Sequence, residues 1–168
     1  MKPFPSLLLV LVFLVSGCGY KLGEIRPTPM RSVRTLSVPN FKNETFESRV
    51  EVLFGDTLVK RLQQDGSYQL VNSGQADAIL SCTITSIRTN SLRSVINNVL
   101  ATSEFGLIVD AKYEVTHQAS GAILMQGTMS GKSSFFSGND LQTSKQQALS
   151  NAALDLADKL TAQVAEGW

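Results

Sequence analysis

The chain has 168 residues, of which 43% are hydrophobic and 17% charged, and its formal net charge is +1. This length and composition are typical of one ordinary domain with its own hydrophobic core. The nearly balanced charge argues against bulk electrostatic attraction to nucleic acid, so we expect no nucleic-acid partner.

The first segment has the features of a secretory signal peptide. Lys2 precedes an apolar run over residues 7–15, and small residues come directly before Cys18. The run is far shorter than the ~20 residues that a membrane-spanning helix needs. The end of the segment resembles the bacterial lipobox, in which cleavage leaves a cysteine that carries palmitate and other acyl chains. We expect residues 1–17 to be a signal peptide and Cys18 to be lipidated; the alternative is a secreted protein whose Cys18 pairs with Cys82.

Acyl chains on Cys18 would hold the mature protein at a membrane. Gly19 and Tyr20 follow it, and neither is the aspartate that commonly keeps lipoproteins of enteric bacteria on the inner membrane. This indicates the outer membrane. Residues 18–32 contain prolines and no apolar periodicity, so they predict an extended tether, and residues 33–168 remain as a single domain.

The first regular elements are a strand and a helix. Residues 33–39 are rich in β-forming side chains and end in a proline, which predicts a strand. Over residues 46–62 apolar side chains recur at spacings of three and four, which is typical of an amphipathic helix. Asn43 or Thr45 is placed to cap the first N–H groups of this helix, and Gly66 is placed to end it.

The middle of the chain predicts strands. Residues 68–71 form a brief extended piece, and residues 78–85 alternate strictly between apolar and polar side chains. Residues 88–102 predict a long hairpin tip. The alternation returns over residues 105–116 and again over residues 123–132, so two further strands are expected there.

The last element is a helix that starts near Asp140 and carries a stripe rich in alanine, which favours close packing on the sheet. Both Thr143 with Gln146 and Ser144 with Gln147 match the spacing of a capping box. The expected fold is α+β, with two helices on one face of a four-stranded, mostly antiparallel sheet, in the order strand, helix, three strands, helix. Serine, threonine and glutamine line the other face.

We find no catalytic or metal-binding pattern, and we expect neither enzymatic activity nor a cofactor. His117 is the single histidine, and no nucleophile with a partnering carboxylate can be argued from spacing. Cys82 falls on the apolar side of its strand, as expected of a core residue. Residues 127–133 look like a phosphate-binding loop, but the segment is one residue too short and lies inside an expected strand.

Several short stretches resemble the lipopolysaccharide-assembly lipoprotein family, LptE type. They are Cys18-Gly19-Tyr20, Leu36-Ser37-Val38-Pro39-Asn40-Phe41, Asp65-Gly66, Tyr68-Gln69-Leu70-Val71 and Ala76-Asp77-Ala78-Ile79-Leu80. The resemblance implies an outer-membrane lipoprotein that partners and plugs a large β-barrel translocon of the LptD type. Together the two proteins would insert lipopolysaccharide into the outer leaflet. The alternative is a lipoprotein adaptor of another envelope secretion or lipid-transport complex.

Direct contact with lipopolysaccharide would need cations, because Arg and Lys form charge-assisted hydrogen bonds to phosphates and carboxylates. Arg88 and Arg93 in the expected hairpin tip, and Lys132 on the polar strand face, are the candidate lipopolysaccharide-binding residues. The alternative for each of them is ordinary solvated surface charge.

Overall fold

The computed structural model describes residues 26–95, 98–137 and 140–167. In chain order the elements are η1 (Thr28–Met30), β1 (Thr35–Ser37), β2 (Lys42–Asn43), α2 (Val50–Asp65), β3 (Gln69–Leu70), η2 (Ser73–Gln75), β4 (Ala78–Val95), β5 (Asn98–His117), β6 (Ile123–Phe136) and α3 (Leu141–Ala165). The expected signal peptide over residues 1–17 and the expected lipidation site Cys18 lie outside the described residues. Within the described ranges, no helix is long and apolar enough to cross a membrane.

The sheet has six strands in the order β3-β1-β4-β5-β6, with β2 also paired to β4. The long strands β4, β5 and β6 are antiparallel, whereas β1, β2 and β3 form short parallel pairs. The expected count of four strands is therefore wrong. Strand β3 lies within residues 68–71, which were expected to be extended but were not counted as a strand of the sheet. Strand β2 has only two residues, which is too short for an alternating pattern to appear in the sequence.

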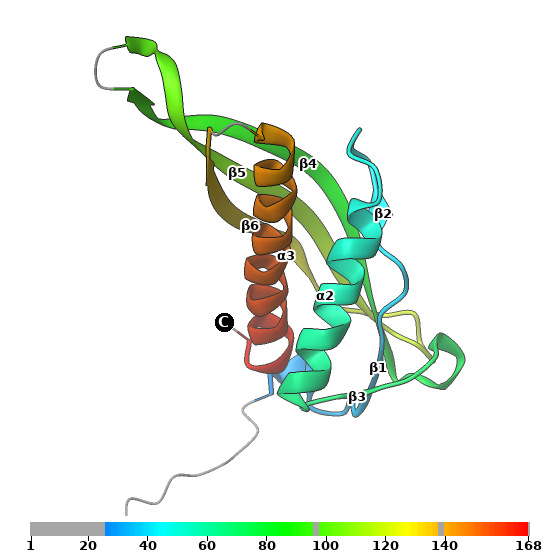
Figure 1. Cartoon of the computed structure of the whole chain (residues 1–168). Helices are drawn as coiled ribbons and strands as arrows, with labels where there is room; N and C mark the ends of the chain where they lie inside the picture. Colours follow the sequence, from blue (N-terminus) through cyan, green and yellow to red (C-terminus); the bar gives the residue numbers. More distant parts are fainter. Residues whose placement is uncertain (1–25, 96–97, 138–139, 168) are drawn as a thin grey trace, which may run out of the picture.

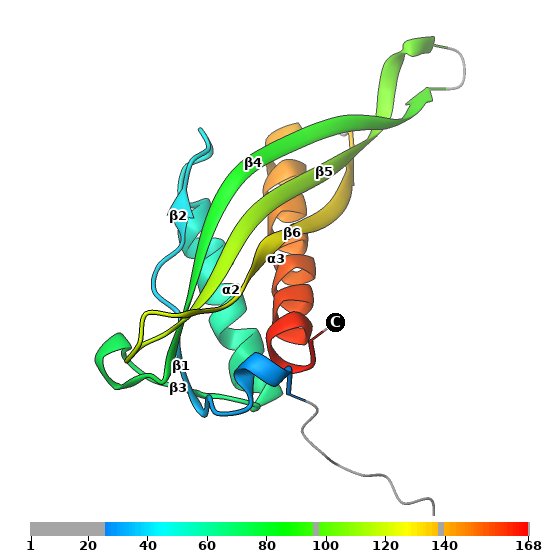
Figure 2. The ribbon, with the colours of Figure 1, turned by 180° about the vertical axis from the view of Figure 1, so that it is seen from behind.

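Both helices lie on the same face of the sheet, as expected. Figure 1 shows α2 and α3 in front of the strands, and the view from behind in Figure 2 shows the strands in front of the helices. The α+β class and the one-sided helix layer are thus confirmed. One face of β4, β5 and β6 is covered by the helices, and the opposite face has no cover among the described residues.

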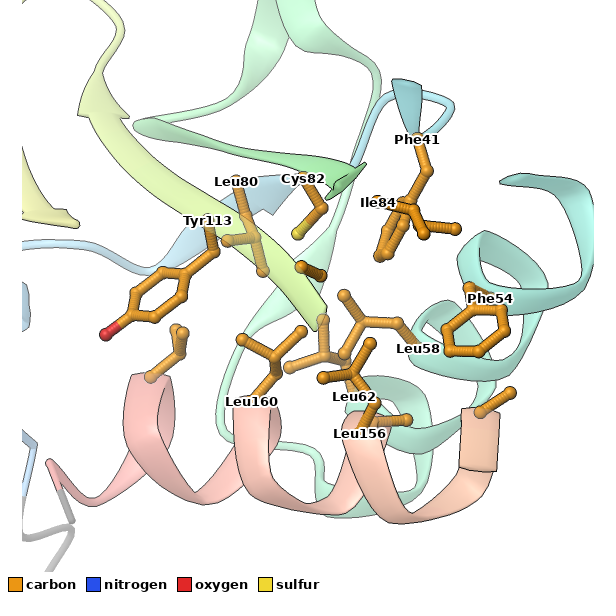
Figure 3. Packing of buried hydrophobic residues seen from close by; sticks show 14 of the residues in the cluster. Phe41, Phe54, Leu58, Leu62, Leu80, Cys82, Ile84, Tyr113, Leu156 and Leu160 are labelled. Carbon is orange, nitrogen blue, oxygen red and sulfur yellow. The ribbon is translucent and has the colours of Figure 1, made fainter. Parts of the chain in front are cut away.

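The core lies between the helices and the covered face of the sheet. On β4 the alternating residues Ala78, Leu80, Cys82 and Ile84 are buried, and Leu58, Leu62, Leu156 and Leu160 meet them from the helices (Figure 3). Cys82 is a small core residue, as its place in the alternation predicts. Burial raises the pKa of its thiol to about 12, so the group is a neutral, inert thiol at neutral pH.

The helix α2 begins later than the apolar pattern predicts. It starts at Val50, after Arg49 in a left-handed conformation with φ of 64°, and Phe46 is 108% exposed instead of contributing to the apolar stripe. Asn43 explains the delay, because its side chain accepts the N–H of Thr45 at 2.9 Å and donates to the carbonyl of Glu47 at 2.8 Å. The expected capping residues therefore build the loop before the helix. At the other end, Gly66 with φ of 74° ends α2 as predicted.

The helix α3 starts where the sequence predicts, but Asp140 caps it instead of Thr143 or Ser144. The Asp140 carboxylate accepts the N–H of Thr143 at 2.9 Å and also the Thr143 hydroxyl, and the bond from the hydroxyl, followed by that from the N–H, lowers the pKa of the carboxyl. The helix packs against β6 at Gly131, where an added Cβ would lie 2.3 Å from the Ala152 carbonyl oxygen. The close approach expected from the alanine-rich stripe is confirmed at this point.

An ion pair on α3 covers the middle of the edge strand β6. Asp155 accepts the backbone N–H of Lys132 at 2.8 Å, and Lys159 donates to the carbonyl of Ser130 at 3.0 Å. The two side chains also bond each other at 2.5 Å. Unpaired backbone groups on an edge strand can form hydrogen bonds with a strand of another chain. The Asp155–Lys159 ion pair occupies two of these groups and so protects the edge.

Residues 26–32 pack on the domain instead of forming part of an extended tether. Met30 in η1 is fully buried. Arg26 donates to the carbonyl of Ser67 at 2.6 Å, and its guanidinium lies 4.9 Å from the centre of the Tyr68 ring. Tyr68 in turn donates its hydroxyl to the carbonyl of Val164 at 2.8 Å. The segment therefore links the start of the domain to the end of α3.

The long hairpin is built mainly of strand. β4 continues to Val95 and β5 begins at Asn98, so only residues 96–97 separate them, and those two lie outside the described residues. The hairpin extends beyond the helices at one end of the molecule (Figure 1). Register shifts in the β4–β5 ladder, the first between Ile84 and Ser86, mark β-bulges, which bend and twist a strand pair.

Candidate functional site: the outer face of the sheet

The face of β4, β5 and β6 opposite the helices is called the outer face below. Its side chains alternate with core residues along each strand, so that Lys112 and Glu114 flank the buried Tyr113. The register across the three strands places mostly polar side chains in rows, and these are Ser81, Thr83, Ser86, Arg88, Asn90, Ile108, Asp110, Lys112, Glu114, Gln126, Thr128, Ser130, Lys132 and Ser134. The polar composition expected of this face is confirmed.

Asp110 is the centre of the polar network on the outer face. Its carboxylate accepts hydrogen bonds from the Ser130 hydroxyl at 2.6 Å, the Ser86 hydroxyl at 2.7 Å and Nη2 of Arg88 at 2.7 Å. These donors come from the strands on both sides of β5. The hydrogen bond from Ser130, then that from Ser86 and the nearby cations, lower the pKa of Asp110 against the opposing effect of burial. The carboxylate is therefore held charged and ties three strands together.

Sequence reasoning did not single out Asp110. A charged residue at an outward position of an alternating strand has the pattern of a solvated side chain. Its partners Ser86 and Ser130 are 24 and 20 positions away along the chain, so only the strand pairing brings them together. No local signal in the sequence could have found this network.

The structure places all three candidate cations on the outer face. Arg88 and Lys132 lie on either side of Ile108 in one cross-strand row, which corresponds to a separation of about 10 Å between their backbones. Arg93 lies further along the hairpin, with its guanidinium 3.9 Å from the carboxylate of Glu104. Arg88 thus lies in the body of β4 and not at a loop-like tip, because the strand pairing continues past it.

An open hollow of about 620 Å³ lies elsewhere on the same face. Side chains from three strands and from β2 line it, with Lys42, Lys112 and Glu114 as its charged members. Ser81, Thr83, Gln126 and Thr128 supply hydroxyl and amide groups. A hollow of this composition is wet and offers many hydrogen-bond donors and acceptors but no apolar pocket for a drug-like ligand.

The residues considered above for catalysis and phosphate binding are ordinary parts of the sheet and its turns. His117 ends β5, where its Nδ1 lies 3.3 Å from the hydroxyl of Ser120 in the following turn. Residues 127–133 lie wholly within β6, so the apparent phosphate loop is a strand segment. Across the described ranges, no group of three or more His, Cys, Asp or Glu residues is arranged to hold a metal ion.

Solved structures of other bacterial proteins share this fold. A minor lipoprotein from Acinetobacter baumannii matches with a TM-score of 0.55 and 16% identity, over 79% of this chain and 92% of that one. A hypothetical protein from Chlamydia trachomatis matches with a TM-score of 0.57 and 10% identity, over 79% and 95%. At these identities the likeness concerns the fold alone.

The sequence identifies the family within this class of fold. Residues 33–164 match the LptE family, described as lipopolysaccharide assembly, and the chain belongs to this family. The resemblance drawn from the short sequence stretches is thus confirmed. Among curated protein sequences, no relative matches the chain. The outer face is therefore a candidate surface for a role in lipopolysaccharide assembly in the cell envelope.

Proposed function

We propose that the protein is a lipid-anchored lipoprotein of the outer membrane that partners and plugs a β-barrel translocon of the LptD type. In this proposal residues 1–17 are removed, Cys18 carries the acyl chains, and residues 33–168 form the docking domain. The domain lies partly within the barrel lumen and assists insertion of lipopolysaccharide into the outer leaflet. The family match over residues 33–164 is the observation that carries the proposal.

The outer face supports docking inside a barrel. A barrel lumen is polar, and the outer face presents hydroxyl, amide and charged groups from three strands. The network around Asp110 fixes the side chains of Ser86, Arg88 and Ser130 before any partner binds. Side chains that are already ordered lose less entropy on binding, so a preorganised polar face favours association.

Direct contact with lipopolysaccharide in this proposal is made through Arg88, Arg93 and Lys132. Arg88 bonds Asp110 through one nitrogen, and a guanidinium has five N–H donors, so it can hold a phosphate at the same time. Lys132 lies on the same row of the outer face and is exposed. The two residues can therefore approach one anionic group from either side of Ile108.

The decisive experiment is an affinity pull-down of the lipoprotein from detergent-solubilised envelopes. We expect a large outer-membrane barrel to co-purify with the wild-type protein. Thr128→Trp places a bulky side chain on the outer face, and Gln146→Trp places the same side chain at an exposed position of α3. We expect only Thr128→Trp to reduce recovery of the barrel. Recovery of the lipoprotein alone, or with a different envelope complex, would contradict the proposal.

The anchor has a separate test. Mass spectrometry of the mature protein should show an N-terminal Cys18 that carries acyl chains. A mature chain with an unmodified Cys18, or one joined to Cys82, would disprove the anchor and leave the barrel partnership to be judged by the pull-down.

A further inference from the structure

The edge strand β6 is covered over only part of its length. Toward the hairpin, Asp155 accepts the N–H of Lys132 and Lys159 donates to the carbonyl of Ser130. Both of these backbone groups face away from β5. In an antiparallel strand the N–H and C=O of one residue point to the same side, and this side alternates along the chain. Every second residue of β6 therefore presents its backbone groups at the edge.

The half of β6 toward Ile123 has no such cover. Gln126 and Thr128 lie an even number of positions from Ser130, so their N–H and C=O groups also face the edge. Within the described ranges, no hydrogen bond joins these groups to anything outside the β5–β6 ladder. Residues 126–128 are all exposed. A register shift below Met125 ends the regular ladder, and residues 125–129 are called the open stretch below.

The open stretch also lacks the side chains that usually protect an edge. Natural edge strands often carry charged residues or proline, which discourage pairing with another strand. Residues 118–131 contain no Lys, Arg, Asp, Glu or Pro. The backbone groups of Gln126 and Thr128 are therefore available to an added strand, and no side chain of the open stretch repels one.

The N-terminal end of the described chain lies beside this strand. The short helix η1 lies against β6, and Met30 within it is fully buried. Figure 2 shows η1 at the end of the molecule away from the hairpin, which is also the Ile123 end of β6. Residues 19–25 directly precede Arg26, so they reach the domain at this end. Seven extended residues span about 24 Å, whereas five residues of strand span about 17 Å, so the segment is long enough to cover the open stretch.

We propose that residues 19–25 bind along the open stretch as an added edge strand. The strand runs antiparallel to β6, because its last residue has to lie near η1 at the Ile123 end. In an extended chain Tyr20 and Leu22 point to the same side. This apolar pair fits the helix-covered face, on which Met125 and Met129 already pack partly buried against the core.

The inference goes beyond the proposed function, because it concerns how the chain between the anchor and the domain is held. A docked segment places Cys18 beside β6 and keeps the domain close to its anchor. The packing of Arg26 and Met30 on the domain is continued by such a strand.

Amide hydrogen exchange on the mature lipoprotein in detergent tests the pairing. We expect the N–H groups of Gln126 and Thr128 to exchange slowly in the unsubstituted chain. Lys21→Pro combined with Leu22→Pro should speed their exchange by about tenfold or more. Adjacent residues of a strand point their N–H groups to opposite sides, so one of the two prolines removes a donor that faces β6, whatever the register.

Lys21→Ala combined with Leu22→Ala is the matched control, because it keeps both N–H groups and should keep the slow exchange. The N–H groups of Gly127 and Met129 bond to β5 and should stay protected in every variant, which shows that the domain remains folded.

Two results would overturn the inference. One is fast exchange of Gln126 and Thr128 in the unsubstituted chain. The other is slow exchange that persists in the double-proline variant, which would mean that a different strand covers the edge; sedimentation would then show whether it belongs to a second copy. The measurement needs neither the barrel nor lipopolysaccharide, so both results leave the proposed function to its own pull-down test.

Discussion

The close contact between Gly131 and α3 provides a sensitive test of the fold. An added Cβ at Gly131 would lie 2.3 Å from the carbonyl oxygen of Ala152 and 2.9 Å from Cβ of Leu156. Ordinary contact begins near 3.4 Å, so Gly131→Ala would require β6 and α3 to separate by about 1 Å. The obstructing atoms are a helix carbonyl and a Cβ, and neither can rotate away as the end of a flexible side chain would.

The size of the effect follows from two opposing contributions. Overpacking costs about 1–3 kcal/mol, and a backbone obstruction belongs at the upper end of that range. Alanine in place of glycine also restricts the unfolded chain, which stabilises the protein by about 0.4–1 kcal/mol. We therefore expect Gly131→Ala to lower the free energy of unfolding by about 2 kcal/mol, or the melting temperature by about 4–8 °C for a domain of this size.

Urea unfolding followed by circular dichroism measures the change, on a soluble form of the chain with Cys18→Ser. Gly74→Ala is the control, because an added Cβ at Gly74 meets nothing within 4 Å. It should leave stability unchanged or slightly higher. If Gly131→Ala and Gly74→Ala differed by less than about 0.5 kcal/mol, the close packing of α3 on β6 would be refuted.

Three other substitutions each remove the hydrogen bonds of one side chain. Asp110→Asn should lower the free energy of unfolding at neutral pH by about 2 kcal/mol. The carboxylate of Asp110 accepts three hydrogen bonds from β4 and β6, and the substitution replaces this charged acceptor with a neutral amide. Tyr68→Phe should cost about 1–2 kcal/mol in urea unfolding, because the carbonyl of Val164 loses the hydroxyl that bonds it at 2.8 Å in a buried place. Asp155→Ala uncovers the edge of β6, so sedimentation should detect dimers or larger species.

Each of these three predictions has a control variant or a result that would contradict it. The lowered pKa of Asp110 means that its stabilisation is fully present above the unfolded-chain pKa near 3.8 and is lost as the pH falls through the lower folded-state pKa. The difference between wild type and Asp110→Asn should therefore shrink below about pH 4; a difference that grew on acidification would contradict the network. For the edge, Asp158→Ala removes an exposed ion pair with Arg61 on the neighbouring helix and should leave the protein monomeric. If Tyr68→Phe were as stable as wild type, the predicted contribution of the bond to the Val164 carbonyl would be wrong.

The periodicity of apolar residues was sufficient to predict an element where it persisted over many residues. The alternation along 78–85 and 105–116 predicts the core face of β4 and β5, and the buried residues confirm it. On β6, Met125 and Met129 are partly buried against the core as expected, but Ile123 is 54% exposed, because a register shift at Thr116 interrupts the alternation there. Such patterns work because a strand with one buried face must place every second side chain in the core. The same argument explains why both helices, each with one apolar stripe, cover that face.

Local competition among hydrogen bonds limited the prediction at the helix starts. Asn43 and Thr45 are good capping residues, but Asn43 bonds loop groups, and α2 begins only at Val50. Phe46 continues the apolar spacing yet is exposed, because spacing alone does not tell whether the backbone is helical at that position. Capping-type residues favour turns as readily as helix ends, which leaves the boundary undecided in the sequence.

By itself the sequence determined the class of fold, the family to which residues 33–164 belong and the polarity of each strand face, because these depend on residue types in a fixed order. Only the tertiary structure decided which polar residues act together. Asp110, Ser130 and Arg88 belong to three strands, and Leu92 of β4 has room to lie over β5 because Gly106 carries no side chain. Contacts of this kind depend on strand register, and register is set by the packing of the whole sheet on its helices rather than by any local pattern.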